Sequence, residues 1–108
     1  MLQKTLDDQS QLKIGQNAQD NWDLIDESQS EWYWFHLKSF PSSHVVLCCE
    51  NPSEKSLVVA AQHCKQATKY KNVPNIKVSY CRIGNIQKAG KVGSVTFVSK
   101  RKVKDIRL

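Results

Sequence analysis

Histidine and cysteine side chains give this sequence its widest range of chemistry, because they bind transition metals and form base–nucleophile pairs. The sequence has three histidines and four cysteines: His36, His44, His63, Cys48, Cys49, Cys64 and Cys81. Their spacing fits neither use, since no Cys-x-x-Cys or other zinc-binding pattern is present. The cysteines also lie in apolar runs, where burial raises the pKa of a thiol. We therefore predict reduced core cysteines, no metal, no cofactor and no catalytic residue, with His36 and His44 as strand histidines satisfied by hydrogen bonds.

Other catalytic patterns are missing from the sequence as well. Five carboxylates gather in one polar stretch, as is typical of a solvated surface: Asp20, Asp23, Asp26, Glu27 and Glu31. There is no nucleophile elbow, phosphate-binding loop or dinucleotide fingerprint. We therefore do not expect an enzyme.

Positive charge is concentrated in the second half of the chain. The net charge is +6 over 108 residues. Residues 1–54 contain three lysines and nine acidic residues, whereas residues 55–108 contain thirteen basic residues and one acid, Asp105. Because so dense a charge repels itself, it favours a polyanionic partner whose counterions are released on binding. A solvated basic surface is the alternative interpretation.

The candidate phosphate-binding residues fall on three segments: a helix, a loop and the last turn. They are Lys65, Lys69, Arg82, Lys88, Lys91, Lys100, Arg101 and Lys102. Cations on separate elements with almost no counter-charge indicate an electrostatic track for a nucleic-acid backbone. Trp32, Trp34 and His36 could add a surface on which unpaired bases stack, although packing in the core is the commoner role of tryptophan.

Hydrophobic periodicity predicts the elements that position these residues. Alternating or continuous apolar runs indicate strands. Asn51 to Glu54 marks a helix start that Ser53 can cap, and an apolar stripe from Leu57 to about Tyr70 indicates the helix that follows. Asn17 could cap a short helix before Asp26. The strands are expected at 12–14, 32–38, 44–49, 76–82, 92–98 and 103–108, and a loop at 84–90.

This order of elements predicts an α+β fold, a mostly antiparallel sheet with one long helix, and a short N-terminal helix, packed on it. Residues 1–11 are polar and without period, so we expect a flexible N-terminal segment there. Residues 12–108 should then form a single domain. No apolar run approaches the length that spans a bilayer, and no secretory signal is present, so we expect a cytoplasmic protein without a membrane partner.

Two runs of the sequence are long and unusual enough to compare with known domains. Tyr33 to Leu47 reads YWFHLKSFPSSHVVL, and Gly15 to Leu24 reads GQNAQDNWDL. They resemble the signatures W-F-H-x-K-x-x-P-G-S-H-V-x-L and G-[KR]-N-x-x-x-N-[DE]-x-L of the NFACT-R (NFACT RNA-binding) domain family. The order and spacing of the rest match over roughly residues 12–107, including Lys88 and the run Gly93 to Phe97. Ser42 replaces the glycine of the signature and Gln16 replaces its basic residue. A left-handed turn would be costlier at Ser42, and Gln16 removes one phosphate contact.

The resemblance implies an α+β RNA-binding domain, with large members acting in ribosome quality control on the large subunit and tRNA. Single-domain relatives are linked to tRNA modification, and one branch to DNA sensing. The chain has neither the N-terminal domain nor the coiled coil of the large members, so we do not expect tail elongation by it alone. The matching positions that could touch RNA are Asn17, His36, Lys38, Ser43, His44 and Lys88.

We therefore expect a non-catalytic, single-domain RNA-binding module, with tRNA or rRNA as its partner and the ribosome or a larger protein as a further one. One alternative is a DNA-binding or sensing module, because phosphate attraction serves both nucleic acids. Another is an enzyme or enzyme subunit acting on tRNA, with His36 or His44 as acid or base. A third is a protein adaptor docking on the ribosome through its acidic half, whose binding would survive charge reversal at Lys100, Arg101 and Lys102.

Overall fold

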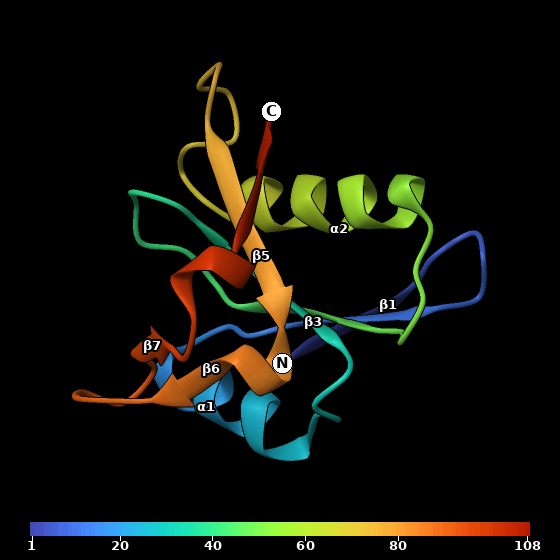
Figure 1. The fold of residues 1–108 in the computed structure, drawn as a ribbon. Helices are drawn as coiled ribbons and strands as arrows, with labels where there is room; N and C mark the ends of the chain where they lie inside the picture. Colours follow the sequence, from blue (N-terminus) through green and yellow to red (C-terminus); the bar gives the residue numbers. More distant parts are fainter.

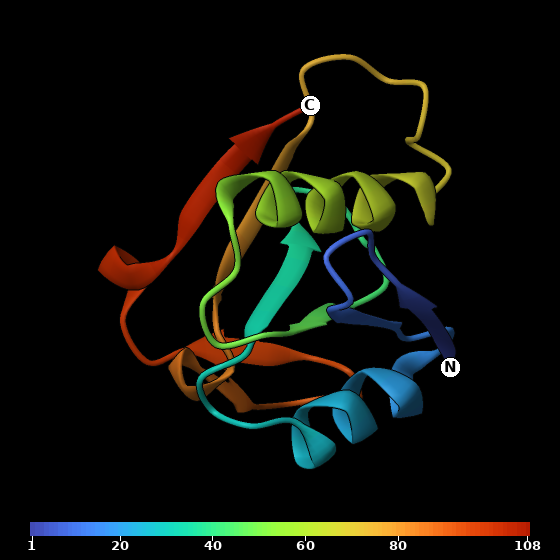
Figure 2. The same ribbon diagram turned by 90° about the vertical axis from the view of Figure 1, so that its right-hand side faces the viewer.

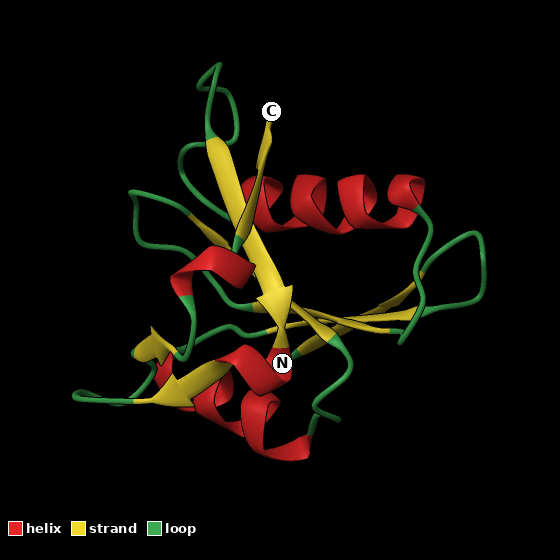
Figure 3. Cartoon of the chain, viewed as in Figure 1, coloured by secondary structure: helices red, strands yellow, loops and turns green.

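The computed structural model describes residues 1–108 and has an α+β architecture in which every strand pair is antiparallel (Figure 3). The main sheet has six strands, in the spatial order β1 (Leu2–Thr5), β2 (Gln11–Ile14), β4 (Val45–Cys48), β3 (Tyr33–Leu37), β5 (Lys77–Arg82) and β8 (Lys104–Arg107). A separate hairpin pairs β6 (Ile86–Lys88) with β7 (Val95–Phe97). The prediction of a mostly antiparallel sheet is confirmed.

Both expected helices are present, but they are of comparable length, so the structure does not show the one long helix that we expected. The helix α1 (Ala18–Glu27) has 10 residues and α2 (Glu54–Gln66) has 13. The predicted caps are confirmed, since Asn17 accepts from the Asp20 N–H and Ser53 from the Ser56 N–H. However, α2 ends before Tyr70, because the Thr68 hydroxyl bonds the Lys65 carbonyl and accepts the Tyr70 N–H, which closes a local turn.

The helices lie on opposite faces of the main sheet, which makes three layers (Figures 1 and 2). On the α2 side, Phe35 and Leu37 pack in a core with Ala60, Ala61 and Cys64. On the other side, residues of α1, β3, β4 and β5 pack against the β6–β7 hairpin, in a second core that contains Leu24, Trp34, Val46, Cys81, Ile83 and Ile86. Both faces of β3 therefore pack against a core.

Two short strands lie where no strand was expected. Residues 1–11 were expected to be a flexible segment, and here Leu2–Thr5 forms β1, which pairs with β2 in the register Leu2↔Ile14 to Thr5↔Gln11. The expected loop at 84–90 contains β6, which follows a 3₁₀ turn at 83–85. Neither strand shows a hydrophobic period, because β1 is exposed throughout and β6 buries only Ile86. Neither helix is long and apolar enough to cross a membrane.

Candidate nucleic-acid interface

Two adjoining pockets open where the β3–β4 turn faces the β6–β7 hairpin. The larger encloses about 720 Å³ and the smaller about 620 Å³. They share five lining residues: His36, Pro41, His44, Gly93 and Ser94. We call the two pockets together the histidine groove. It is the main concave surface of the chain to which predicted RNA-binding residues contribute from several elements.

Seven of the thirteen predicted RNA-binding residues line the histidine groove. Lys38 and Lys100 line the larger pocket, and Asn17, Ser43 and Lys69 the smaller one, with His36 and His44 between them. These residues come from separate parts of the chain, which the sheet order β4-β3-β5-β8 brings to one side. The family-like motif and two of the basic candidates, Lys69 and Lys100, therefore meet at one surface.

Hydrogen bonds fix the two ring nitrogens of each histidine in opposite roles. His36 Nδ1 lies 2.6 Å from the Leu37 carbonyl oxygen, and since a carbonyl only accepts, Nδ1 carries the proton and Nε2 is an acceptor. His44 Nδ1 accepts from Trp34 Nε1–H at 3.0 Å, so the proton of neutral His44 is on Nε2. The ring centroids lie 5.2 Å apart. The pair thus offers one acceptor and one donor.

The free Nε2 atoms of both histidines reach the space of the groove. Neither atom has a hydrogen-bond partner in the protein. Because every fully buried side-chain nitrogen and oxygen has a partner, both Nε2 atoms must be accessible to solvent. Burial lowers the pKa of His36. Burial, together with the repulsion that two protonated rings would exert on each other, lowers the pKa of His44 to about 3, so both rings are neutral near pH 7. The expectation that both histidines are held by hydrogen bonds is confirmed.

Asn21 and Gly15 hold His44 in place. The Asn21 side-chain oxygen accepts the His44 backbone N–H at 3.1 Å, and the His44 carbonyl accepts the Gly15 N–H at 3.0 Å. A Cβ at Gly15 would lie 2.2 Å from that Asn21 oxygen, so any larger residue there would displace the Asn21 side chain from His44. These contacts give a physical reason for the glycine and the second asparagine of the G-x-N-x-x-x-N motif.

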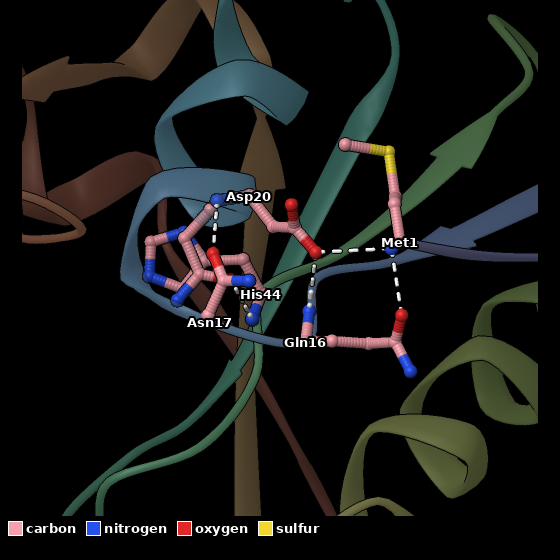
Figure 4. Close-up of polar contacts among 6 residues, drawn as sticks. Met1, Gln16, Asn17, Asp20 and His44 are labelled. Atoms are coloured by element: carbon pink, nitrogen blue, oxygen red, sulfur yellow. Dashed lines mark hydrogen bonds and ion pairs between the residues drawn. The ribbon is translucent and has the colours of Figure 1, made fainter.

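The other motif positions next to α1 also support the fold (Figure 4). Asn17 Oδ1 accepts the Asp20 N–H at 2.8 Å, and the Asp20 carboxylate accepts the Gln16 N–H at 3.0 Å and pairs with the Met1 amine at 3.1 Å. Gln16 Oε1 accepts from the same amine at 2.7 Å. Gln16 therefore makes an intramolecular contact where the signature has a basic residue.

Ser42 does not adopt the left-handed conformation that a glycine would permit. Only Gln9 and Asn75 have positive φ among the non-glycine residues. The Ser42 hydroxyl instead accepts the Leu37 N–H at 3.0 Å and donates to the Ser43 carbonyl at 3.1 Å. The turn therefore needs no left-handed residue at Ser42 and is stabilised by the serine side chain.

Most of the basic residues in the second half stay free of carboxylates. Among the thirteen of residues 55–108, Lys88 alone forms an ion pair, with Asp26 at 2.6 Å. In the groove, Lys38 pairs with Asp105 at 2.7 Å, whereas Lys69 and Lys100 have no acidic partner. Asp105 is the one carboxylate of the lining; burial opposes its charge, but hydrogen bonds from Lys38 and Ser79 outweigh this and lower its pKa.

Six predicted RNA-binding residues lie outside the lining of the groove. Lys91, Arg101 and Lys102 are exposed and adjoin lining residues along the chain. Arg82 donates to the Glu31 and Glu50 carbonyls and lies over the Tyr33 ring, so its guanidinium holds neighbouring segments of the chain together. Lys65 donates to the Leu108 carbonyl at 3.4 Å, in a separate pocket. Lys88 is the residue paired with Asp26.

Of the three side chains proposed for stacking, His36 and Trp34 line the groove and Trp32 does not. Trp34 is only 2% exposed and Trp32 packs against the second core, so both tryptophans have the core role. Phe40 is 38% exposed at the larger pocket and contacts Tyr70 of the smaller one, with ring centroids 4.5 Å apart. Phe97 also lines the larger pocket. The sequence signal for Phe40 was its place in a turn, where an apolar side chain has few core partners.

The cysteines are free thiols in or near the core. Burial raises the pKa of Cys48, of Cys64 to about 12 and of Cys81 to about 11, as expected for thiols in apolar runs. No three of the histidine, cysteine, aspartate and glutamate side chains are grouped so as to hold a metal ion.

Comparisons with known proteins place this chain beside two longer ones. It is 30% identical over 95 residues to the Bacillus subtilis protein "Rqc2 homolog RqcH", covering 85% of this chain and 17% of that protein. Its fold matches the C-terminal part of the fibronectin/fibrinogen-binding protein of Streptococcus suis with a TM-score of 0.89 and 26% identity, over 98% of this chain and 43% of that structure. No family model matches. The chain thus corresponds to one part of each larger protein.

Proposed function

We propose that this chain is a non-catalytic RNA-binding module of the NFACT-R type, and that the histidine groove is its RNA-binding surface. One observation carries the proposal: Lys69 and Lys100, both free of carboxylates, line the two pockets on which the family-like motif converges. Free cations beside a groove with a single, already paired carboxylate attract a phosphate backbone.

The likeness to RqcH supports the NFACT-R assignment, because the two sequence motifs point to the same family by their own residues. Large NFACT proteins are associated with ribosome quality control, so tRNA or rRNA is the proposed RNA, in the cytoplasm. The ribosome or a larger protein is the proposed further partner. The absence of catalysis is supported by the raised pKa values of the Cys64 and Cys81 thiols and by the histidine hydrogen bonds, in which neither ring is paired with a hydroxyl or a thiol.

The test is a fluorescence-anisotropy titration with labelled tRNA, single-stranded RNA and duplex DNA at two salt concentrations. The double variant Lys69→Glu/Lys100→Glu reverses one free cation in each pocket. Its matched control, Lys4→Glu/Lys55→Glu, makes the same change in charge at exposed lysines that line neither pocket. We expect the groove variant to lose at least tenfold in affinity for tRNA, and the control to lose much less.

Each other outcome points to one of the alternatives. Equal affinity for DNA and tRNA would indicate a general nucleic-acid or DNA-sensing module. Equal losses in both variants would mean that net charge alone drives binding and that the groove is not the site. No binding to any nucleic acid at low salt would reject the proposal in favour of a protein ligand, for which fibronectin, named in the Streptococcus suis protein, is one probe.

A further inference from the structure

We infer that the larger pocket of the histidine groove binds one unpaired nucleobase of the RNA, with His36 Nε2 accepting and His44 Nε2–H donating a hydrogen bond. The inference rests on the proposed function and assigns separate tasks within it. Phosphates are held by lysines such as Lys69 and Lys100 at the groove, while the histidine pair contacts a base.

The chemistry of the pair selects a base over a phosphate. A phosphate oxygen only accepts hydrogen bonds, so it would face the acceptor lone pair of His36 Nε2 unfavourably. Every nucleobase carries a donor and an acceptor side by side on its Watson–Crick edge, for example N3–H and O4 of uracil. A ligand of that kind matches an adjacent acceptor and donor, and this edge is free only when the base is unpaired.

Surrounding contacts keep this arrangement fixed. The Trp34 indole donates to His44, stacks on the His36 ring with a centroid distance of 5.7 Å, and is almost fully buried. Neither histidine is therefore free to exchange the roles of its nitrogens without losing a hydrogen bond. The nearby charge is also balanced, since the ammonium of Lys38 is bound to Asp105. Of the two lysines that line the larger pocket, Lys38 is therefore neutralised by Asp105, and Lys100 is left for a phosphate.

The walls of the larger pocket suit a flat, partly apolar ligand. They include Phe40, Phe97 and Val103, and the volume of about 720 Å³ has room for a base with its ribose. Phe40 is exposed enough to stack on a base, and such stacking tolerates any base. Apolar walls around a neutral donor–acceptor pair are common to sites that bind splayed-out bases of single-stranded RNA.

The experiment compares two strands of equal charge: ten-nucleotide oligouridine and an abasic ribose-phosphate strand of the same length. Anisotropy competition gives the ratio of their dissociation constants for the wild-type chain, for His36→Phe and for the matched control His63→Phe. His63 lies on α2 and lines a different pocket. We expect the wild type and the control to prefer the uridine strand about tenfold, and His36→Phe to bring this ratio close to one while affinity for the abasic strand is unchanged.

A second measurement does not depend on a variant that folds. In ¹⁵N spectra of the wild-type histidine rings, the Nε2 signals of His36 and His44 should shift on addition of oligouridine and not of the abasic strand, with His63 unaffected. Free uridine monophosphate, tested as a competitor, should displace the strand only at concentrations far above the dissociation constant of the strand.

Three results would overturn the inference and leave the proposed function standing. The first is equal affinity for the uridine and abasic strands. The second is a preference for the uridine strand that survives His36→Phe, with unshifted histidine signals, and the third is displacement of the uridine strand by free uridine monophosphate near the dissociation constant of the strand. In the last case the pocket would be a nucleotide site. If neither strand binds even at low salt, the proposed function itself fails.

Discussion

His44 is 3% exposed, and its ring is used on both sides, by Trp34 at Nδ1 and by the groove at Nε2. Such a histidine stabilises the fold only in its neutral form, because protonation of Nδ1 would remove the acceptor for Trp34. Burial lowers its pKa to about 3, well below the value near 6.5 of an unfolded histidine. At the scale of single residues, acid is therefore a direct probe of the histidine pair.

We predict that the free energy of unfolding falls as the pH is lowered from 6.5 to 5. In this window the unfolded chain binds a proton at His44 and the folded chain does not, so stability decreases toward acid by at most about 1.4 kcal/mol per pH unit for this group. His36, whose pKa is also lowered, acts in the same direction. Urea unfolding at pH 7, 6 and 5 measures the slope.

The variant His44→Gln should flatten this slope, since glutamine retains an oxygen acceptor for Trp34 but does not titrate. His63→Gln is the matched control and should change the slope less, because His63 is far less buried than His44. A slope of equal size in wild type and His44→Gln would contradict the assignment of a neutral, buried His44. The folded carboxylates with lowered pKa, such as Asp105, titrate below this window.

Gly15 and Asn21 should be energetically coupled. We predict that Gly15→Ala destabilises the wild type strongly, because its Cβ would lie 2.2 Å from the Asn21 side-chain oxygen. In an Asn21→Ala background the obstacle is gone, so the same change should cost about 1–2 kcal/mol less. A double-mutant cycle by urea unfolding gives the coupling. Additive effects of the two changes would show that the Asn21 side chain is not the obstacle.

At the scale of elements, Asn17 separates a structural from a recognition role. The family resemblance makes it a candidate RNA contact, and the structure shows it capping α1. Asn17→Ala should cost about 1 kcal/mol in unfolding free energy, whereas Asn17→Ser retains a capping oxygen and should cost little. If both variants weaken RNA binding equally, the amide itself touches RNA; if only Asn17→Ala does, the effect comes through α1. Urea unfolding and anisotropy together distinguish the two.

The elements that could be predicted from the sequence are those with a strong hydrophobic pattern or a cap. Strands β3, β4 and β5 and the starts of both helices fall within about a residue or two of expectation. The exposed strand β1 could not be foreseen, because its stability comes from pairing with β2 and not from burial. The end of α2 was missed because a Thr68 side-chain hydrogen bond competes with helix propagation.

The candidate site was predictable in its residues but not in its arrangement. His36, His44 and the free lysines stand out by type and charge. Nothing local in the sequence shows that Trp34 donates to His44, or that the β6–β7 hairpin closes one side of the groove. These contacts depend on tertiary packing. For the same reason Phe40 was not foreseen as the exposed aromatic residue of the pocket.

At the scale of the whole molecule, folding does not neutralise the imbalance of charge between the two halves. A fold could have paired the acids of residues 1–54 with the bases of residues 55–108, but only Lys88 and Asp26 meet in this way. The three cations of the turn at 100–102 are exposed and unpaired, and one of them, Lys100, lies in the wall of the larger pocket. Unpaired like charges repel one another, and this repulsion is reduced when phosphates bind.

We predict from this a salt dependence that the turn at 100–102 controls. If Lys100 and Arg101 each bind a phosphate of single-stranded RNA, the slope of log affinity against log salt should become less steep in Lys100→Ala/Arg101→Ala, by about 0.7 for each phosphate that the variant no longer neutralises. The control Lys4→Ala/Lys55→Ala removes the same charge away from the groove and should leave the slope nearly unchanged. Anisotropy titrations with one RNA strand at four salt concentrations measure both slopes. Equal slopes for the groove variant and the wild type would place the phosphate-binding residues elsewhere, even if affinity falls. The slope reports the number of neutralised phosphates, whereas a change of fold or of long-range attraction can alter affinity without changing that number.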